Sequence, residues 1–208
     1  MKILFFGDSI TDAGRDRESD VSETALGCGY VKYAAQELTA GGENEVINRG
    51  ISGHRVVDLY ARIKVDCWNL KPDVLSILIG VNDVWHELYH QNGVEIDRFE
   101  KVYRMLLEDT KKVLPDTKII LCEPFVLQGA ATMEKYDEFL DVYNYAKLVK
   151  RLAEEYGCEF LPLQDKLTAA AETSQATDYL SDGVHTAEKG AMLIADEWLQ
   201  LFREKVAK

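Results

Sequence analysis

Short apolar runs alternate along this chain with longer segments in which apolar residues recur at helical spacing. Five of these runs are too short for stable helices and rich in aliphatic or aromatic residues, so they are predicted to be strands: 2–6, 45–48, 74–79, 118–122 and 158–161. Helices are predicted at 31–38, 56–63, 96–113, 136–156 and 187–206. This alternation indicates an α/β fold with a parallel sheet covered on both faces.

The last predicted helix has a recognisable start and an apolar inner face. Thr186 is expected to be its N-cap, and Glu188 suits its first turn, where an acidic side chain interacts favourably with the helix dipole. Trp198 lies on the apolar face and is expected in the core or at a subunit interface.

Composition excludes several classes of protein. The 208 residues are enough for one domain with a sizeable core, and 36 acidic against 24 basic residues give a net charge of −12, which disfavours nucleic acid and anionic membranes. The four cysteines are scattered, without a C-x-x-C pair, and are expected to be reduced. The first strand starts at the N-terminus, so no signal peptide is expected and the location is predicted to be cytoplasmic.

The sequence contains no complete cofactor-binding motif. Gly27 and Gly29 begin a dinucleotide fingerprint, but Lys32 stands in place of its third glycine, and no strand precedes it. There is no P-loop either. No cofactor is expected.

Polar residues follow the first three predicted strands, at the edge of a parallel sheet where ligands bind. Ser9, Gly53 and Asn82 lie in these loops, and the loop before the last helix carries Asp182 and His185. Each residue taken singly also fits an ordinary turn or helix cap. Their order along the chain, each at a strand end or in a loop that can face it, favours a shared site.

These residue types are the ones that acyl transfer requires. A serine hydroxyl becomes nucleophilic when a neighbouring base takes its proton, and His185 is the candidate base for Ser9. Asp182 is close enough in sequence to orient the histidine ring. The backbone N–H groups of Ser9 and Gly53, with the Asn82 amide, are candidate donors to the oxyanion that forms during attack.

Four sequence blocks resemble those of the SGNH, or GDSL-type, hydrolase family. They are Gly7-Asp8-Ser9, the segment 48–53 (NRGISG), Gly80-Val81-Asn82-Asp83 and Asp182-Gly183-Val184-His185. The resemblance spans the chain and implies one SGNH hydrolase domain, 1–208, with a flavodoxin-like three-layer α/β/α sandwich and a five-stranded parallel sheet of order 2-1-3-4-5. It also implies that Ser9, His185 and Asp182 form a triad, with Gly53 and Asn82 in the oxyanion hole.

Longer matches around these blocks look most like single-domain acetylxylan esterases and related carbohydrate deacetylases. The resemblance therefore implies a serine esterase that removes acetyl or other small acyl groups from sugars such as acetylated xylose or xylo-oligosaccharides. Asp8, Trp85 and Tyr179 are candidate substrate contacts, although aromatic residues beside a pocket also serve in packing. His54 departs from the family pattern, in which a smaller polar residue such as asparagine is expected.

Two other functions stay open. A thioesterase or lysophospholipase of the same superfamily would need a long apolar acyl channel, and a non-catalytic carbohydrate-binding protein would not need the full set of site residues found here. The expected partner is a small-molecule or oligosaccharide ester, without nucleic acid or membrane. The oligomeric state is left open, a homo-oligomer included.

A competing motif lies just after Asn82. The segment 86–90, HELYH, fits the zinc-protease pattern H-E-x-x-H, and Gly93 extends it. A zinc protease needs both histidines on a stable helix and a third protein ligand. Asn92 and Gly93 should end the helix, and Ile96 stands where the third histidine belongs. The preferred interpretation is a polar helix at the mouth of the pocket, with no metal.

Overall fold

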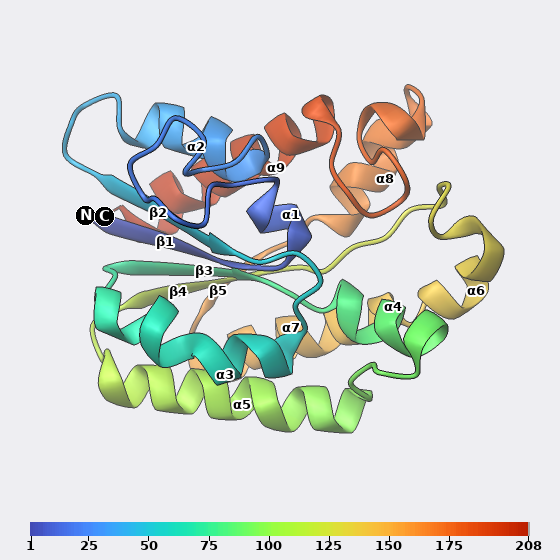
Figure 1. Cartoon of the computed structure of the whole chain (residues 1–208), viewed down its shortest axis with the longest axis horizontal. Coiled ribbons are helices and arrows are strands. Elements are labelled where there is room, and N and C mark those ends of the chain that lie inside the picture. The colour runs from blue at the N-terminus through green and yellow to red at the C-terminus, as the bar shows by residue number, and fades with distance from the viewer. Residues whose placement is uncertain (208) are drawn as a thin grey trace.

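The computed structural model describes residues 1–207, in which five strands form one parallel sheet (Figure 1). The sheet order is β2-β1-β3-β4-β5, with β1 at Lys2–Gly7, β2 at Glu45–Gly50, β3 at Val74–Leu78, β4 at Lys118–Cys122 and β5 at Glu159–Leu161. Gly7 pairs with Gly50 on one side and with Leu78 on the other. The first three strands therefore end level with one another, as the predicted site requires.

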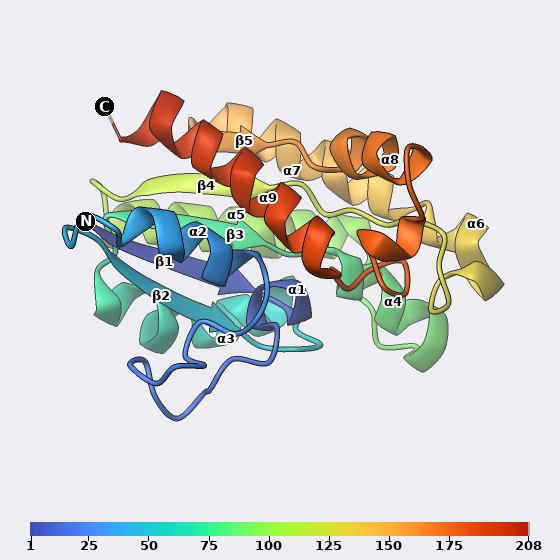
Figure 2. The same cartoon turned by 90° about the horizontal axis from the view of Figure 1, so that it is seen from above.

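Helices cover both faces of this sheet (Figures 1 and 2). One face carries α2 (Tyr30–Leu38) and α9 (Glu188–Leu201), and the other carries α3 (Val56–Asp66), α5 (Ile96–Val113) and α7 (Val142–Tyr156). Both ends of the described chain lie at the edge opposite the strands' carboxyl ends (Figure 1). The expected three-layer α/β/α sandwich and its strand order are confirmed.

Shorter elements gather at the carboxyl edge of the sheet. They are α1 (Ser9–Asp12), α4 (Val81–His90), α6 (Tyr136–Phe139) and α8 (Gln164–Glu172). Single 3₁₀ turns occupy Trp68–Leu70, Met133–Lys135 and Ala176–Asp178, and a π-turn continues α9 over Phe202–Val206.

The central strands form the core of the sandwich. All five residues of β3 are buried, as are the last five of β1. Trp198 of α9 is fully buried, stacks on Phe202 with ring centroids 5.1 Å apart, and donates its indole N–H to the Ser76 hydroxyl at 2.9 Å. Of the two places expected for Trp198, the structure shows the core.

Two sequence-based helix boundaries are wrong. The predicted helix 136–156 is divided into α6 and α7, because the chain turns at Leu140 and Asp141 through tighter i→i+3 hydrogen bonds. Thr186 is not the N-cap of α9, because it forms an isolated antiparallel bridge with Leu180 and the capping position falls to Ala187.

The four cysteines are free thiols, two of them buried. Within residues 1–207, no helix has both the length and the apolar character that crossing a bilayer would demand.

Candidate active site

Ser9 is the first residue of α1, directly after β1. The side chain of Asp8 caps this turn, since its Oδ1 accepts from the Ile10 N–H at 2.9 Å. Ala13 adopts the left-handed conformation and ends the helix after four residues. The short helix holds the Ser9 hydroxyl at the sheet edge, where it lines a pocket.

The loop after β2 is held against this turn. A Cβ at Gly50 would lie 2.1 Å from the Asp12 nitrogen, so only glycine allows the two backbones to approach this closely. The Asp12 carboxylate accepts from the Ser52 N–H at 2.9 Å and from its hydroxyl at 3.0 Å, and it also pairs with Arg17. Gly53 follows with φ +80°, a conformation that favours glycine.

Asn82 and Asp83 lie in the first turn of α4, which follows β3. The Asn82 amide nitrogen donates to the backbone oxygen of His54 at 3.1 Å, which orients the amide beside the pocket. The Asp83 carboxylate accepts from the Val56 N–H at 3.1 Å, at the start of α3. Asp83 therefore connects α4 to the start of α3, three residues after Gly53.

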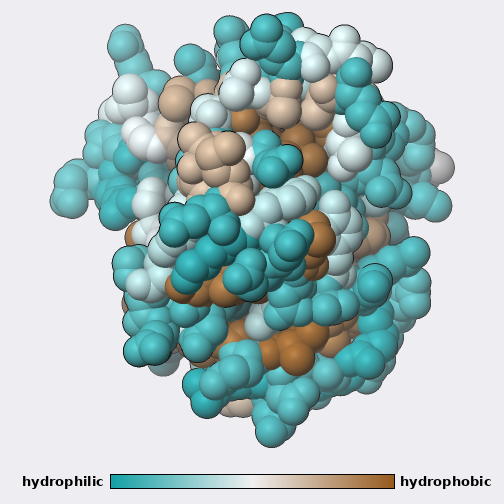
Figure 3. Space-filling model, turned by 90° about the vertical axis from the view of Figure 1, so that its right-hand side faces the viewer, coloured by the Kyte–Doolittle hydropathy of each residue, from teal (hydrophilic) through white to brown (hydrophobic). Residues whose placement is uncertain are grey.

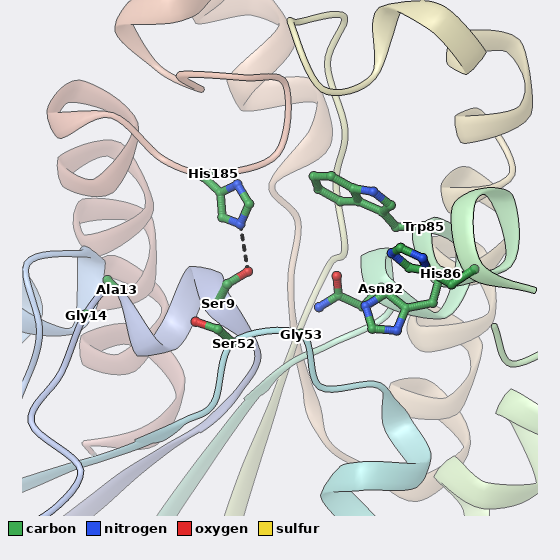
Figure 4. Close-up of a pocket in the computed structure, with 10 residues that line it drawn as sticks. Ser9, Ala13, Gly14, Ser52, Gly53, Asn82, Trp85, His86 and His185 are labelled. Carbon is green, nitrogen blue, oxygen red and sulfur yellow. Dashed lines mark hydrogen bonds between the residues drawn. The ribbon is translucent and has the colours of Figure 1, made fainter. Parts of the chain in front are cut away.

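A tight loop before α9 carries Asp182 and His185. Oδ1 of Asp182 accepts from the N–H groups of Val184 at 2.9 Å and His185 at 2.8 Å. Its Oδ2 lies 2.7 Å from His185 Nδ1, and Nε2 of the same ring lies 2.9 Å from Ser9 Oγ (Figure 4). The three side chains form a continuous chain of hydrogen bonds that ends on the serine oxygen.

A segment that the sequence did not single out supports this loop. The backbone oxygens of Asp182 and Gly183 accept from the N–H groups of Ala131 and Leu127, both at 2.9 Å. A Cβ at Gly129 would lie 2.3 Å from the Asp182 carbonyl carbon. The glycine is a signal in the sequence, but nothing local shows which loop it contacts.

The carboxyl groups around the site differ in their electrostatics. Burial alone would raise the pKa of Asp182, but hydrogen bonds from His185 and from two backbone N–H groups lower it overall. Burial raises the pKa of Asp8 to about 7, against opposing contributions from the Ile10 N–H and the charge of His185. Burial likewise raises the pKa of Asp83 well above its usual range.

The pocket has a volume of about 460 Å³. Ser9, Ala13, Gly14 and Ser52 lie on one side of it, and Trp85 and His86 on the other (Figure 4). His185, Asn82, Gly53 and His90 complete the lining. The end of the molecule that holds the strands' carboxyl ends is largely hydrophilic, with apolar atoms in separate patches (Figure 3).

Five of the candidate residues named from the sequence thus line one pocket: Ser9, Gly53, Asn82, Trp85 and His185. Asp182 stands behind His185. Within residues 1–207, neither the Ser9 nor the Gly53 backbone N–H donates to a protein acceptor, so both remain available at the pocket. Ala13, Gly14 and Ser52 also line the pocket and were not predicted to do so. Ser52 lies within the block 48–53, and Ala13 and Gly14 follow Ser9 by four and five residues.

Two expected substrate contacts are not at the pocket. Asp8 is fully buried, and its carboxyl turns inward to cap α1. Tyr179 does not line the pocket, because its backbone packs against Gly190 and accepts from Ala187 at the start of α9. Trp85 does line it, with its ring 5.8 Å from that of His185.

His54, the departure from the family pattern, does not line the pocket. Its Nδ1 accepts from the Arg62 guanidinium at 3.0 Å, while its backbone oxygen holds the Asn82 amide. The contact to Asn82 uses the backbone, so it does not depend on which side chain stands at position 54.

The H-E-x-x-H segment lies on α4, which ends at His90. The Glu87 carboxylate accepts from the Gly93 N–H at 3.0 Å, and no group of three or more metal-ligating side chains exists within the described chain. Ile96 begins α5 and supplies no ligand. The segment therefore lacks the third ligand of a zinc protease.

Known proteins resemble this chain over nearly its full length. Residues 5–193 match the GDSL-like lipase/acylhydrolase family. The acetylxylan esterase of Geobacillus stearothermophilus is 37% identical over 207 residues, covering 96% of this chain and 92% of that protein. A GDSL-like lipase from Parabacteroides merdae has a TM-score of 0.87 at 41% identity, covering 98% of this chain and 96% of its own.

Solved variants of the Geobacillus enzyme, Axe2, carry alanine in place of a serine, an aspartate or a histidine and are described as catalytic mutants. Each has a TM-score of 0.84 with this chain at 34% or 35% identity, covering 96% of this chain and 92% of the other. These matches confirm the family resemblance seen in the four blocks. The chain belongs to the GDSL-like lipase/acylhydrolase family and is a carboxylic ester hydrolase.

Proposed function

We propose that the protein is a serine esterase that removes acetyl and other small acyl groups from carbohydrates such as acetylated xylose or short xylo-oligosaccharides. The hydrogen-bonded chain from Asp182 through His185 to Ser9, open to a pocket of about 460 Å³, is the observation that carries this proposal. The pocket lies within the size range of small-molecule sites.

Acylation begins with the Ser9 hydroxyl. His185 Nε2, 2.9 Å from Ser9 Oγ, takes its proton while the oxygen attacks the ester carbonyl carbon. Asp182 accepts a hydrogen bond from the Nδ1–H of His185, which orients the ring and stabilises the imidazolium that forms. Because the pKa of Asp182 is lowered, its carboxylate stays ionised at neutral pH.

The attack converts the carbonyl oxygen into an oxyanion. The N–H groups of Ser9 and Gly53 and the amide of Asn82 are the donors assigned to this charge. Their positions are fixed before reaction by the α1 cap, by the Asp12 contact to Ser52 and by the Asn82 contact to His54. Donors held in place in advance require little reorganisation when the charge develops.

The tetrahedral intermediate collapses when its carbon–oxygen bond to the alcohol breaks. His185 gives its proton to the departing alcohol oxygen, which leaves an acyl group on Ser9. Water then attacks the acyl carbon, with His185 as the base again, and the proton returns to Ser9 as the carboxylic acid leaves. The chain's own residues thus account for every proton moved.

Support for a small acyl group and a sugar alcohol comes from the pocket and from the relatives. The surface at this end of the molecule is largely hydrophilic (Figure 3), which suits a hydroxyl-rich alcohol better than a lipid tail. Trp85 offers an aromatic ring beside His185 on which a sugar ring can stack. The 37% identical relative is named for acetylxylan.

A panel of esters graded by acyl length and by alcohol tests this proposal, with Ser9→Ala as the inactive control. Acetyl esters should be hydrolysed best, and kcat/KM should fall once the acyl chain exceeds about four carbons, because added methylenes must fit a small pocket. A preference for octanoyl or longer chains would instead favour the thioesterase or lysophospholipase alternative. Wild-type protein without activity on any ester would favour the carbohydrate-binding alternative.

Trp85→Ala tests the sugar assignment separately. The substitution should impair acetylated xylo-oligosaccharides more than a simple aryl acetate, because it removes the ring on which the sugar stacks. Equal losses on both substrates would leave the serine mechanism intact and remove the stacking role. A serine-directed organophosphate should abolish activity, whereas a chelator should not.

A further inference from the structure

Two histidines on α4 lie side by side at the catalytic pocket. His86 and His90 are four residues apart, so they project from the same face of the helix, and both line the pocket that holds Ser9. Their ring centroids are 5.7 Å apart and their planes are at 82°. We propose that this pair is a binding site for a divalent transition-metal ion such as Zn²⁺ or Cu²⁺, and that the bound ion blocks ester hydrolysis.

The separation of the two rings suits one shared ion. An ion about 2.0–2.1 Å from an imidazole nitrogen lies about 3.2 Å from the ring centroid, so two rings at a tetrahedral angle have centroids about 5.2 Å apart. The observed 5.7 Å is close to this separation, and the His90 side chain is exposed.

The ring nitrogens of both histidines are available to bind an ion. Within residues 1–207, neither ring takes part in a hydrogen bond or an ion pair. The positive charge of Arg55, which acts on His86, is compensated, because its guanidinium pairs with Asp58 at 2.9 Å.

The expected ion follows from the ligand chemistry. Two imidazole ligands suit Cu²⁺, Ni²⁺ and Zn²⁺, with Cu²⁺ the tightest, whereas Mg²⁺ and Ca²⁺ prefer oxygen ligands. Water fills the remaining positions, so the ion stays exchangeable. The chain's net charge of −12 favours the approach of cations.

The site lies where an ion would interfere with the reaction. A Cβ at Gly53 would be 4.0 Å from His86 Nε2, so the ring stands beside the loop assigned to the oxyanion hole. An ion with its waters would occupy part of the roughly 460 Å³ that the ester needs. This blocking effect rests on the proposed function, but binding of the ion does not.

Calorimetric titration with Zn²⁺ in a non-chelating buffer tests the site directly. The wild type should bind one ion per chain, and His86→Ala and His90→Ala should each weaken binding at least tenfold. Glu87→Gln should bind like the wild type, since its side chain is engaged with Gly93 rather than with the pair. Ser9→Ala should also bind normally, which separates the metal site from the proposed catalytic serine.

Unchanged Zn²⁺ affinity in His90→Ala, or no binding by the wild type, would overturn the site. Zn²⁺ should also inhibit hydrolysis of an aryl acetate by the wild type, EDTA should reverse the inhibition, and equal Mg²⁺ should have no effect. Stoichiometric binding that leaves the hydrolysis rate unchanged would overturn the block while the site stands. If the wild type hydrolyses no ester, the proposed function fails, and the calorimetric result still decides the metal site.

Discussion

Asp8→Asn should make the protein more stable at and above neutral pH, although the substitution is next to the proposed nucleophile. The Asp8 side chain is fully buried, its Oδ1 accepts from the Ile10 N–H at 2.9 Å, and its Oδ2 has no partner within the described chain. An ionised carboxylate in this place is poorly solvated, so burial raises its pKa from 3.8 to about 7. Asparagine keeps the capping oxygen and cannot ionise.

The raised pKa of Asp8 fixes the sign and the size of the effect. Between pH 3.8 and about 7, the folded protein holds a proton on Asp8 that the unfolded chain has lost. The group's contribution to stability is therefore complete below pH 3.8 and is lost as pH rises to 7. A pKa shift of about three units corresponds to about 4 kcal/mol of unfolding free energy.

Urea denaturation of the wild type and Asp8→Asn at pH 5, 6, 7 and 8 measures this loss. The stability advantage of the variant should grow by about 1.4 kcal/mol per pH unit up to pH 7 and then level off. Asp178→Asn is a matched control: hydrogen bonds from Lys189 and Ser174 lower the pKa of Asp178, so its effect should be constant over this range. A constant difference between Asp8→Asn and the wild type from pH 5 to 8 would refute the reasoning.

Three further predictions concern the reaction. Ser9→Ala and His185→Ala should each lower kcat about 10⁴-fold or more. The double variant should be little worse than either, because the two side chains act as a unit. Multiplicative losses of kcat in steady-state assays would contradict their assigned roles. Asn82→Ala should lower kcat about 10²- to 10³-fold with little change in KM, since its amide meets charge that develops only in the transition state; a raised KM with normal kcat would make it a substrate-binding residue instead. Asp12→Ala should lower kcat about 10- to 10²-fold by releasing the Ser52 loop, and Asp12→Asn, which keeps an acceptor oxygen, should restore part of the lost kcat. Folding of both variants is checked by thermal melting. If both folded variants have wild-type kcat, other contacts hold the loop.

The strands could be predicted because their apolar residues are the ones that the fold buries. The apolar runs in β1 and β3 are buried on both faces, as expected for central parallel strands. The four residues of α1 are too few to show a helical period. In α8 the buried residues are Gln164 and Leu167, and the Gln164 amide bonds to both backbone groups of Val126. A single buried apolar residue within the helix is too weak a pattern to mark it.

The division between α6 and α7 had no local signal. No proline or glycine lies near Leu140, and the apolar period continues through it. The reason is tertiary: Phe139 at the end of α6 packs edge-on against Trp85 at 5.6 Å, while α7 packs along the sheet. Two different packing partners require two helix directions.

The residue types at the site could be predicted from the sequence. The contacts that align these residues could not. The Asp12 contact to Ser52 joins positions 40 apart, and the inward turn of Asp8 depends on α1, which the sequence did not indicate. Tyr179 adjoins the Asp182 block in sequence, yet its backbone packs on α9. Proximity along the chain was therefore a poor guide to proximity at the pocket.

The hydrogen bond between Ser9 and His185 joins residues 176 positions apart, nearly the full span of the chain. During synthesis, 176 positions separate the serine from the histidine that is its hydrogen-bond partner. During refolding, ester hydrolysis should begin when the loop before α9 docks, after the sheet has formed. Conversely, local detachment of that loop would abolish ester hydrolysis but leave the circular dichroism of the helices and strands unchanged. Activity and circular dichroism would therefore report different unfolding events.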